Sequence, residues 1–521
     1  MDRRRVLGVA AAVAGAAGVG AAVIGGYGDS GSGPSSGSAA AGSTPPTGAA
    51  TSTTSAPVAE ADLPGNNDWR IINSSPPHAI EGYADKVSVV PGESVGLRVS
   101  TASATFRVSA YRMGYYAGAE ARRVWQSDAV PGKKQGAAQL DSGTKTVHTA
   151  WQNSLTVPTT GWPEGAYLLR LDGSDGHQSY IPLIVRSTSG AGRVVLMHAP
   201  ATWQAYNLWG GYNLYQGPDG SYDTRSYVVS FDRPYENDGA DRFMVYERAA
   251  VALAERLRLP LAYTTGIDVH NDPSVLNAAR AVISLGHDEY WTPQQRASVT
   301  KARDAGVNIA FLGANTCFRR IRFGSSPVGA NRQLICYKTA YTMDPLYDRE
   351  PAQVTTDYRA APAADPESSM TGVLYEGYPA DAPFVVHAAD HWLFQGTGVK
   401  NGDSFAHLVG VEYDRVTPDQ PTPRPIQIIA HSPLVCNGRS SHADAAYYTV
   451  PSGAGVFASG TMRWVEGLMA DTRDDRTDHD MDRRTAAFVS RTTENLLRAF
   501  AAGPAGHMQP TPKDNVHEVY G

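Results

Sequence analysis

The sequence predicts an α/β protein in which an all-β domain precedes an open α/β sheet. The chain has 521 residues, which is too long for one hydrophobic core. Residues 66–188 carry short alternating strand patterns separated by turn signals, which is typical of a β-sandwich. In residues 193–505, short continuous apolar runs alternate with helical patterns, as buried parallel strands and their covering helices do. We therefore expect two folded domains with these bounds.

The all-β pattern consists of strand-forming runs with turns between them. Valines alternate with polar residues around a Pro-Gly turn in 86–101, and the same alternation continues further on. The expected strands lie within 86–101, 106–116, 165–173 and 179–186. This spacing favours two antiparallel sheets packed face to face.

The second domain is predicted from alternating strands and helices. Residues 193–199, RVVLMHA, form a buried strand, and a helix covers 241–257, with Phe243, Tyr246 and Ala250 on its apolar face. Thr292, Pro293 and Gly306 mark the start and the end of another helix. The other expected elements are strands 259–265, 279–286 and 307–315, helices 292–306 and 485–503, and short strands between 317 and 470.

The N-terminus predicts an export signal in residues 1–25. Three consecutive arginines precede an apolar run, 6–24, and the paired arginines followed by Val-Leu are typical of twin-arginine signals. An uncleaved membrane anchor is the alternative, because the run is close to the roughly 20 residues that span a bilayer. Residues 26–60 are rich in Ser, Gly, Pro and Ala, which indicates a flexible linker. We expect an exported protein, extracellular or in the cell envelope.

Composition and charge narrow the class of function. The formal net charge is -6, and no basic stripe of the kind that binds nucleic acid is present. Tyrosines outnumber phenylalanines by 26 to 12. A tyrosine combines an apolar ring with a polar tip, so this excess suits wet clefts, sugar-binding faces or phenolate metal ligands.

The three cysteines leave one pairing open. Cys317 and Cys336 lie in two short runs that could form a hairpin, and an exported protein permits a disulfide. Whether they bond does not follow from the sequence. No C-x-x-C is present, so a thiolate zinc site is not expected.

Polar and aromatic residues follow three of the predicted parallel strands. They occupy 200–215, 287–292 and 314–320, which contain Tyr, Trp, Asn, His and acidic residues. In an open α/β sheet, ligands bind beyond the carboxyl ends of the strands. The three segments therefore predict one site at this edge of the sheet.

The same segments carry a family resemblance. TWQAYNLWGGYNLY, VSFDRPY, SLGHDEYWT and AFLGAN occur in this order, and together they resemble the large (beta) subunit of N,N-dimethylformamidase. The resemblance extends from about residue 66 to 503. It implies an iron-dependent amide hydrolase whose fold is similar to that of glutamine amidotransferases. It also implies a small second subunit, and the sequence leaves open whether one exists here or whether the chain forms a homo-oligomer.

The resemblance implies a mononuclear ferric iron held by two tyrosine phenolates and one glutamate. Carried over, the glutamate is Glu289 and the first phenolate is Tyr206. We expect Tyr235 as the second phenolate, because it lies in a loop that is free to turn into the site. Tyr246 is the alternative, although its helical spacing favours a place in the core. Phenolate and carboxylate oxygens are hard ligands that suit ferric iron.

Two further residues are expected to carry catalysis. His287 lies two residues before Glu289, so both side chains point to the same side of an extended loop. A neutral His287 could take the proton of an attacking water or donate one to the leaving amine. Glu412, in LVGVEYDR, is expected to orient that histidine.

The sequence thus leads to an exported, metal-dependent hydrolase of C–N bonds in small amides. The metal would polarise the amide carbonyl and lower the pKa of bound water. The alternative is a non-enzymatic exported protein that binds glycans or the cell wall through its Tyr and Trp side chains. Iron content separates the two hypotheses.

Overall fold

The computed structural model describes residues 59–72, 75–470 and 479–521. The predicted export signal, and the predicted linker except for its last two residues, lie outside the described part. Residues 60–521 form one compact unit. No helix in the described ranges is long and apolar enough to cross a membrane.

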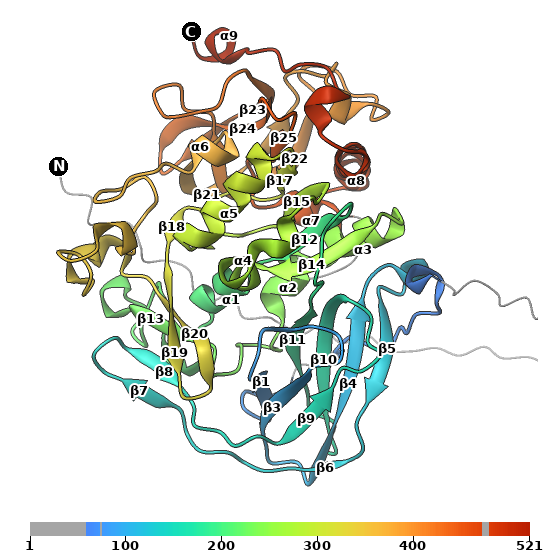
Figure 1. The fold of residues 1–521 in the computed structure, drawn as a ribbon, viewed down its shortest axis with the longest axis vertical. Helices are drawn as coiled ribbons and strands as arrows, with labels where there is room; N and C mark the ends of the chain where they lie inside the picture. The colour runs from blue at the N-terminus through green and yellow to red at the C-terminus, as the bar shows by residue number, and fades with distance from the viewer. Residues whose placement is uncertain (1–58, 73–74, 471–478) are drawn as a thin grey trace, which may run out of the picture. The chain divides into compact units, whose positions relative to one another are not determined.

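The N-terminal part of this unit consists of two sheets that share one core (Figure 1). One sheet has the order β1-β3-β9 and the other has the order β2-β11-β10-β4-β5, with β6 beside β4. Leu97 and Val99 of β3 meet Leu169 of β10 and Leu183 of β11 in the core between the sheets. The strands are β1 (Ile80–Ala84), β2 (Ser88–Val89), β3 (Ser94–Thr101), β4 (Thr105–Met113), β5 (Ala121–Gln126), β6 (Val130–Pro131), β9 (Leu155–Pro158), β10 (Gly165–Gly173) and β11 (Gln178–Val185), with a separate hairpin of β7 (Gln139–Asp141) and β8 (Thr146–His148).

The C-terminal part is built on a seven-stranded sheet with the order β14-β12-β15-β17-β25-β24-β23. The first five strands are parallel, and β24 and β23 are antiparallel to their neighbours. Its strands are β12 (Val194–His198), β14 (Leu261–Thr265), β15 (Ala281–Ser284), β17 (Asn308–Phe311), β23 (Ile426–Cys436), β24 (Arg439–Thr449) and β25 (Gly455–Ala458).

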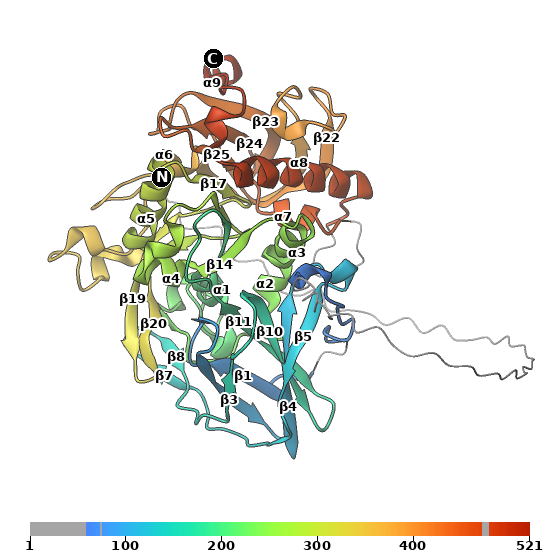
Figure 2. The same ribbon diagram turned by 45° about the vertical axis from the view of Figure 1, so that its right-hand side comes forward.

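Helices cover both faces of this sheet because its strands are apolar on both sides. Val194 and Leu196 pack into one core with α3 (Arg248–Arg256) and α8 (Arg483–Ala502), the long red helix of Figure 2. Val195 and Met197, which alternate with them along β12, pack into a second core with α5 (Pro293–Asp304). The predicted mixed α/β class is confirmed.

The remaining elements surround the two main parts. The helices are α1 (Pro200–Tyr206), α2 (Asp241–Tyr246), α4 (Gly266–Asn271), α6 (Ser368–Thr371), α7 (Trp464–Gly467) and α9 (Val516–Tyr520). The strands are β13 (Val228–Ser230), β16 (Tyr290–Trp291), β18 (Arg319–Arg320), β19 (Arg322–Ser326), β20 (Gly329–Ile335), β21 (Leu374–Val385) and β22 (Ser404–Arg415). The 3-10 helices are Glu60–Asp62, Tyr116–Gly118, Trp209–Gly211, Tyr222–Thr224, Pro273–Leu276, Lys338–Met343, Pro351–Gln353, Trp392–Phe394 and Ala505–His507.

The structure corrects one sequence prediction and answers one question that the sequence left open. The predicted single helix over 241–257 is wrong, because the chain leaves helical geometry at Glu247 and forms α2 and α3. Cys317 and Cys336 are both free and buried. They belong to different hydrophobic clusters, so the hairpin of β19 and β20 does not bring them together.

Candidate active site

The loops that follow β12, β15 and β17 converge as the sequence predicts. Tyr206 is the last residue of α1, which begins two residues after β12. His287 and Glu289 lie in the loop between β15 and β16. Gly286 allows this loop to approach α2 closely, because a methyl group there would lie 2.2 Å from the carbonyl oxygen of Tyr246. Tyr246 is thereby placed beside His287.

A web of hydroxyl groups surrounds the Glu289 carboxylate. The Tyr206 hydroxyl donates to Glu289 Oε2 at 2.6 Å, and the Tyr215 hydroxyl donates to the same oxygen at 2.8 Å. The two tyrosine oxygens are 2.8 Å apart, and their rings are stacked. Tyr290 in turn donates to the Tyr215 oxygen at 2.8 Å. The oxygens of Tyr206, Tyr215 and Glu289, all of a kind that binds hard metal ions, therefore lie within 2.8 Å of one another.

The Arg319 guanidinium is the main group that keeps the Glu289 carboxylate ionised, because burial lowers the pKa of the neighbouring Lys338 well below its ordinary value. The side chain of Glu289 is completely buried, and burial alone would raise its pKa. The Arg319 guanidinium, whose Nε lies 3.1 Å from Oε1, holds the pKa of this carboxyl below its ordinary value. Lys338 Nζ lies 3.1 Å above the centre of the Tyr215 ring. The site therefore provides an anionic carboxylate.

His287 lies between two carboxylates without bonding to either. Its Nε2 is 3.6 Å from Glu289 Oε2 and 3.5 Å from Glu412 Oε2. Among the described residues, neither ring nitrogen has a hydrogen-bond partner, although the side chain is buried. The rings of Tyr206 and Tyr246 both contact the imidazole, at centroid distances of 5.2 Å and 5.7 Å. Burying an imidazole without hydrogen bonds destabilises the folded state, so a substrate or water is expected to bond to these nitrogens.

Glu412 comes from β22, more than 120 residues further along the chain than His287. Asn315, which follows β17, donates from its Nδ2 to Glu412 Oε2 at 2.7 Å. The backbone N–H of Asn315 donates to Asp414 at 2.8 Å. Asn315 thus joins the loop after β17 to β22 and holds the Glu412 carboxylate in place beside His287.

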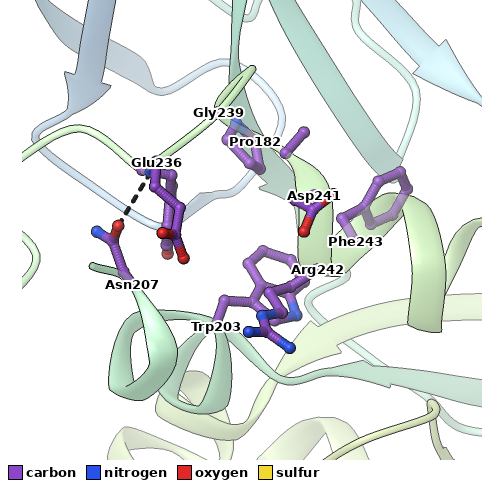
Figure 3. Close-up of a pocket in the computed structure, with 10 residues that line it drawn as sticks. Pro182, Trp203, Asn207, Glu236, Gly239, Asp241, Arg242 and Phe243 are labelled. Carbon is purple, nitrogen blue, oxygen red and sulfur yellow. Dashed lines mark hydrogen bonds between the residues drawn. The ribbon is translucent and has the colours of Figure 1, made fainter. Parts of the chain in front are cut away.

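The structure does not bring Tyr235 to this cluster. Its ring packs edge to face on Trp203 at 6.4 Å and lines a pocket, which Figure 3 shows with Trp203, Asn207 and Arg242. The loop is held there by Arg233, which donates to three backbone carbonyl oxygens of residues 207–212. Of the two tyrosines considered for the second phenolate, Tyr246 is the one beside His287.

Sequence reasoning also missed three residues of the site. Tyr215 ends the segment 200–215 that carries Tyr206, and Arg319 lies within the segment 314–320 that carries Asn315. A search of the whole motif for hydroxyl and guanidinium groups would have included both. Lys338 carries no such signal, because it lies far along the chain in a segment with no motif.

The donor set fits a hard metal ion. Within the described ranges, no group of three or more His, Cys, Asp and Glu side chains could hold a metal, so any site here depends on tyrosine oxygens. Ligand oxygens at right angles around an ion bound at 2.0–2.1 Å lie about 2.8–3.0 Å apart. The Tyr206 and Glu289 oxygens are already 2.6 Å apart, close to that spacing, and the Tyr215 hydroxyl bonds to both of them. The unpaired nitrogens of His287 lie next to these oxygens.

Comparisons with known proteins identify one family. The model described as "N,N-dimethylformamidase beta subunit-like, C-terminal" matches residues 107–479, which include every candidate residue of the site. Among curated proteins, none matches this chain. A solved structure of a cycloisomaltooligosaccharide glucanotransferase from Paenibacillus sp., complexed with cycloisomaltoheptaose, matches at 11% identity and a TM-score of 0.14. That match covers 49% of this chain and 33% of the other, and it carries no argument.

Proposed function

Because this chain belongs to the N,N-dimethylformamidase beta subunit-like family, we propose that it is a metal-dependent hydrolase of C–N bonds in small amides. One observation carries the proposal. His287 is buried with both ring nitrogens unpaired, and it lies between Glu289 and Glu412 beside a cluster of phenolic oxygens. A structural histidine in such surroundings would be hydrogen-bonded.

Tyr206, Tyr246 and Glu289 would hold one ferric iron. Tyr206 and Glu289 already converge, and the Tyr246 ring lies beside His287, with 5.7 Å between the ring centroids. Burial raises the pKa of the Tyr246 hydroxyl, and the Arg242 guanidinium, 6.0 Å from the centre of its ring, partly offsets that rise. The Tyr215 hydroxyl donates to Glu289 and accepts from Tyr290, so it would hold the Glu289 carboxylate in place and would not bind the ion itself. When bound, the iron would act as a Lewis acid toward an amide carbonyl and water.

His287 would move the proton. It can accept a proton from the attacking water at one ring nitrogen and return it to the leaving amine, which a neutral imidazole does well near pH 7. Glu412, 3.5 Å from Nε2, would orient the ring and stabilise its protonated form. Asn315 would keep that carboxylate aimed at the imidazole.

Three further features belong to the proposal. Export follows from the arginines and the apolar run of residues 1–25. We propose a second subunit because the matching family is named for a beta subunit, with a homo-oligomer as the alternative. A relationship to glutamine amidotransferases would follow from the parallel sheet and its site at the carboxyl ends of the strands.

The experiment measures amine release from small formamides and acetamides, in parallel with iron content. The wild-type protein is compared with Glu289→Ala and with Tyr235→Phe, which changes a tyrosine outside the cluster. We expect wild-type and Tyr235→Phe proteins to release amine and Glu289→Ala to release none. A protein with full iron occupancy that releases no amine from any amide would overturn the hydrolase proposal.

A further inference from the structure

A second carboxylate–histidine pair lies behind the candidate site, and the proposed chemistry does not use it. Glu247 and His198 are both completely buried, and His198 Nδ1 donates to Glu247 Oε2 at 2.5 Å. The other carboxylate oxygen accepts from Trp203 Nε1 at 2.9 Å and from the backbone N–H of Ala199 at 3.1 Å. One carboxylate thus bonds to three groups around it.

The three donors belong to two segments, and Glu247 itself belongs to a third. His198 is the last residue of β12, Ala199 is the N-cap of α1, and Trp203 is the middle residue of α1. Tyr206 ends α1, three residues after Trp203. Glu247 directly follows Tyr246, at the break between α2 and α3. The carboxylate therefore links the segments that carry both tyrosines proposed as ligands.

The break at Glu247 is explained by these bonds. Its backbone has φ −131° and ψ −38°, which is not helical, and α3 restarts at the next residue. In an uninterrupted helix, the side chain at position 247 would point about 100° around the helix axis from that of Tyr246, and the helix would continue into α3 without a break. The bonds to His198, Ala199 and Trp203 instead fix Glu247 toward β12 and α1.

We propose that Glu247 is a positioning residue that holds Tyr206 and Tyr246 at a fixed separation, so that both can bind the same ion. This inference rests on the proposed metal function for its consequence, but the positioning itself is a property of the metal-free protein. Glu247 would fix the geometry of two ligands without binding the ion itself. Replacing Glu247 would therefore weaken metal binding without removing a ligand.

The chain offers a matched control. Asp444 is a buried carboxylate in β24 that accepts from His431 Nδ1 at 2.7 Å, from the Tyr520 hydroxyl at 2.5 Å and from the backbone N–H of Val416 at 2.9 Å. It has the same three kinds of donor as Glu247, namely an imidazole, an aromatic side chain and a backbone amide. It links β24 to α9, so Asp444→Asn should disturb α9 and spare α1 and α2.

The test is hydrogen exchange of the metal-free protein, read by mass spectrometry over residues 200–206 and 241–246. We expect Glu247→Met to accelerate exchange in both segments together and Glu247→Gln to do so less, because an amide oxygen can still accept from Trp203 and Ala199. Trp203→Phe removes one donor and keeps the carboxylate, so it should loosen α1 more than α2, which Trp203 contacts through Phe243. This variant remains informative if Glu247→Met does not fold. Unchanged exchange in both Glu247 variants, or equal changes in Asp444→Asn, would overturn the inference.

Iron affinity, measured by competition with a chelator, supplies the second readout. We expect Glu247→Gln to weaken it by about 10–100-fold, the range for residues that orient ligands, and Asp444→Asn to leave it unchanged. Wild-type affinity in a Glu247→Gln protein whose α1 and α2 exchange faster would overturn the link to the ligands. Wild-type protein that binds no iron, with α1 and α2 still loosened together, would overturn the proposed function and leave the positioning role standing.

Discussion

Replacing Gly286 by alanine should push the loop that carries His287 away from Tyr246 at the end of α2. The added methyl group would lie 2.2 Å from the Tyr246 carbonyl oxygen and 2.7 Å from its Cβ. Ordinary contact begins at 3.4 Å, so α2 and the loop must move apart by about 1.2 Å, the difference between 3.4 Å and 2.2 Å. Overpacking of this kind costs about 1–3 kcal/mol. The left-handed φ of 49° adds about 1–2 kcal/mol for a residue with a Cβ.

The assay is urea unfolding of Gly286→Ala beside Gly192→Ala. Gly192 also has a positive φ, 71°, but a methyl group there meets nothing within 4 Å. We expect a loss of about 2–5 kcal/mol for Gly286→Ala and only about 1–2 kcal/mol for Gly192→Ala. The rate of amide hydrolysis should fall by about 100-fold in the first variant only, because a displacement near 1 Å has that effect on aligned groups. Equal losses in the two variants would refute the close approach of His287 and Tyr246.

Three further predictions follow from the site and its surroundings. Tyr246→Phe should lose most of the iron while Tyr235→Phe keeps it, as elemental analysis of the two proteins would measure; equal iron in both would remove Tyr246 from the ligand set. His287→Ala should keep much of its iron and lose about 10²–10⁴ in rate, so loss of iron in step with rate would show it to be a ligand. Burial lowers the pKa of His391 to about 3, so the unfolded state binds the proton first as pH falls below about 6.5, and stability should drop by up to about 1.4 kcal/mol per pH unit toward pH 3. His391→Gln should flatten that dependence in urea titrations, and an unchanged slope would exclude His391 as its source.

Much of the α/β part could be predicted from local patterns. Residues 193–199 are continuously apolar because β12 is buried on both faces, and the structure places that strand at 194–198. Thr292 and Pro293 predict the start of α5, and the Thr292 side chain accepts from the Gln295 N–H as an N-cap should. The meeting of Tyr206 and Glu289 follows from their places after two neighbouring parallel strands.

The parts that could not be predicted depend on contacts between distant residues. Phe243, Tyr246 and Ala250 keep helical spacing, so nothing local announces the break at Glu247, which depends on His198, 49 residues earlier. Tyr235 has the freedom of a loop, but Arg233 fixes that loop to the carbonyl oxygens of residues 207–212. Local sequence patterns predict neither the Glu247–His198 bond nor the bonds of Arg233, because each joins residues that are far apart in the sequence.

The most direct test of the metal assignment is elemental analysis of the purified, folded protein together with its visible absorption spectrum. We predict one iron per chain and an absorption band from phenolate-to-iron charge transfer. Both should be lost in Glu289→Ala and retained in Tyr235→Phe. Glu289 bonds to the oxygens of Tyr206 and Tyr215, whereas Tyr235 packs on Trp203 away from them. A wild-type protein that folds, hydrolyses amides and contains no iron would contradict the assignment.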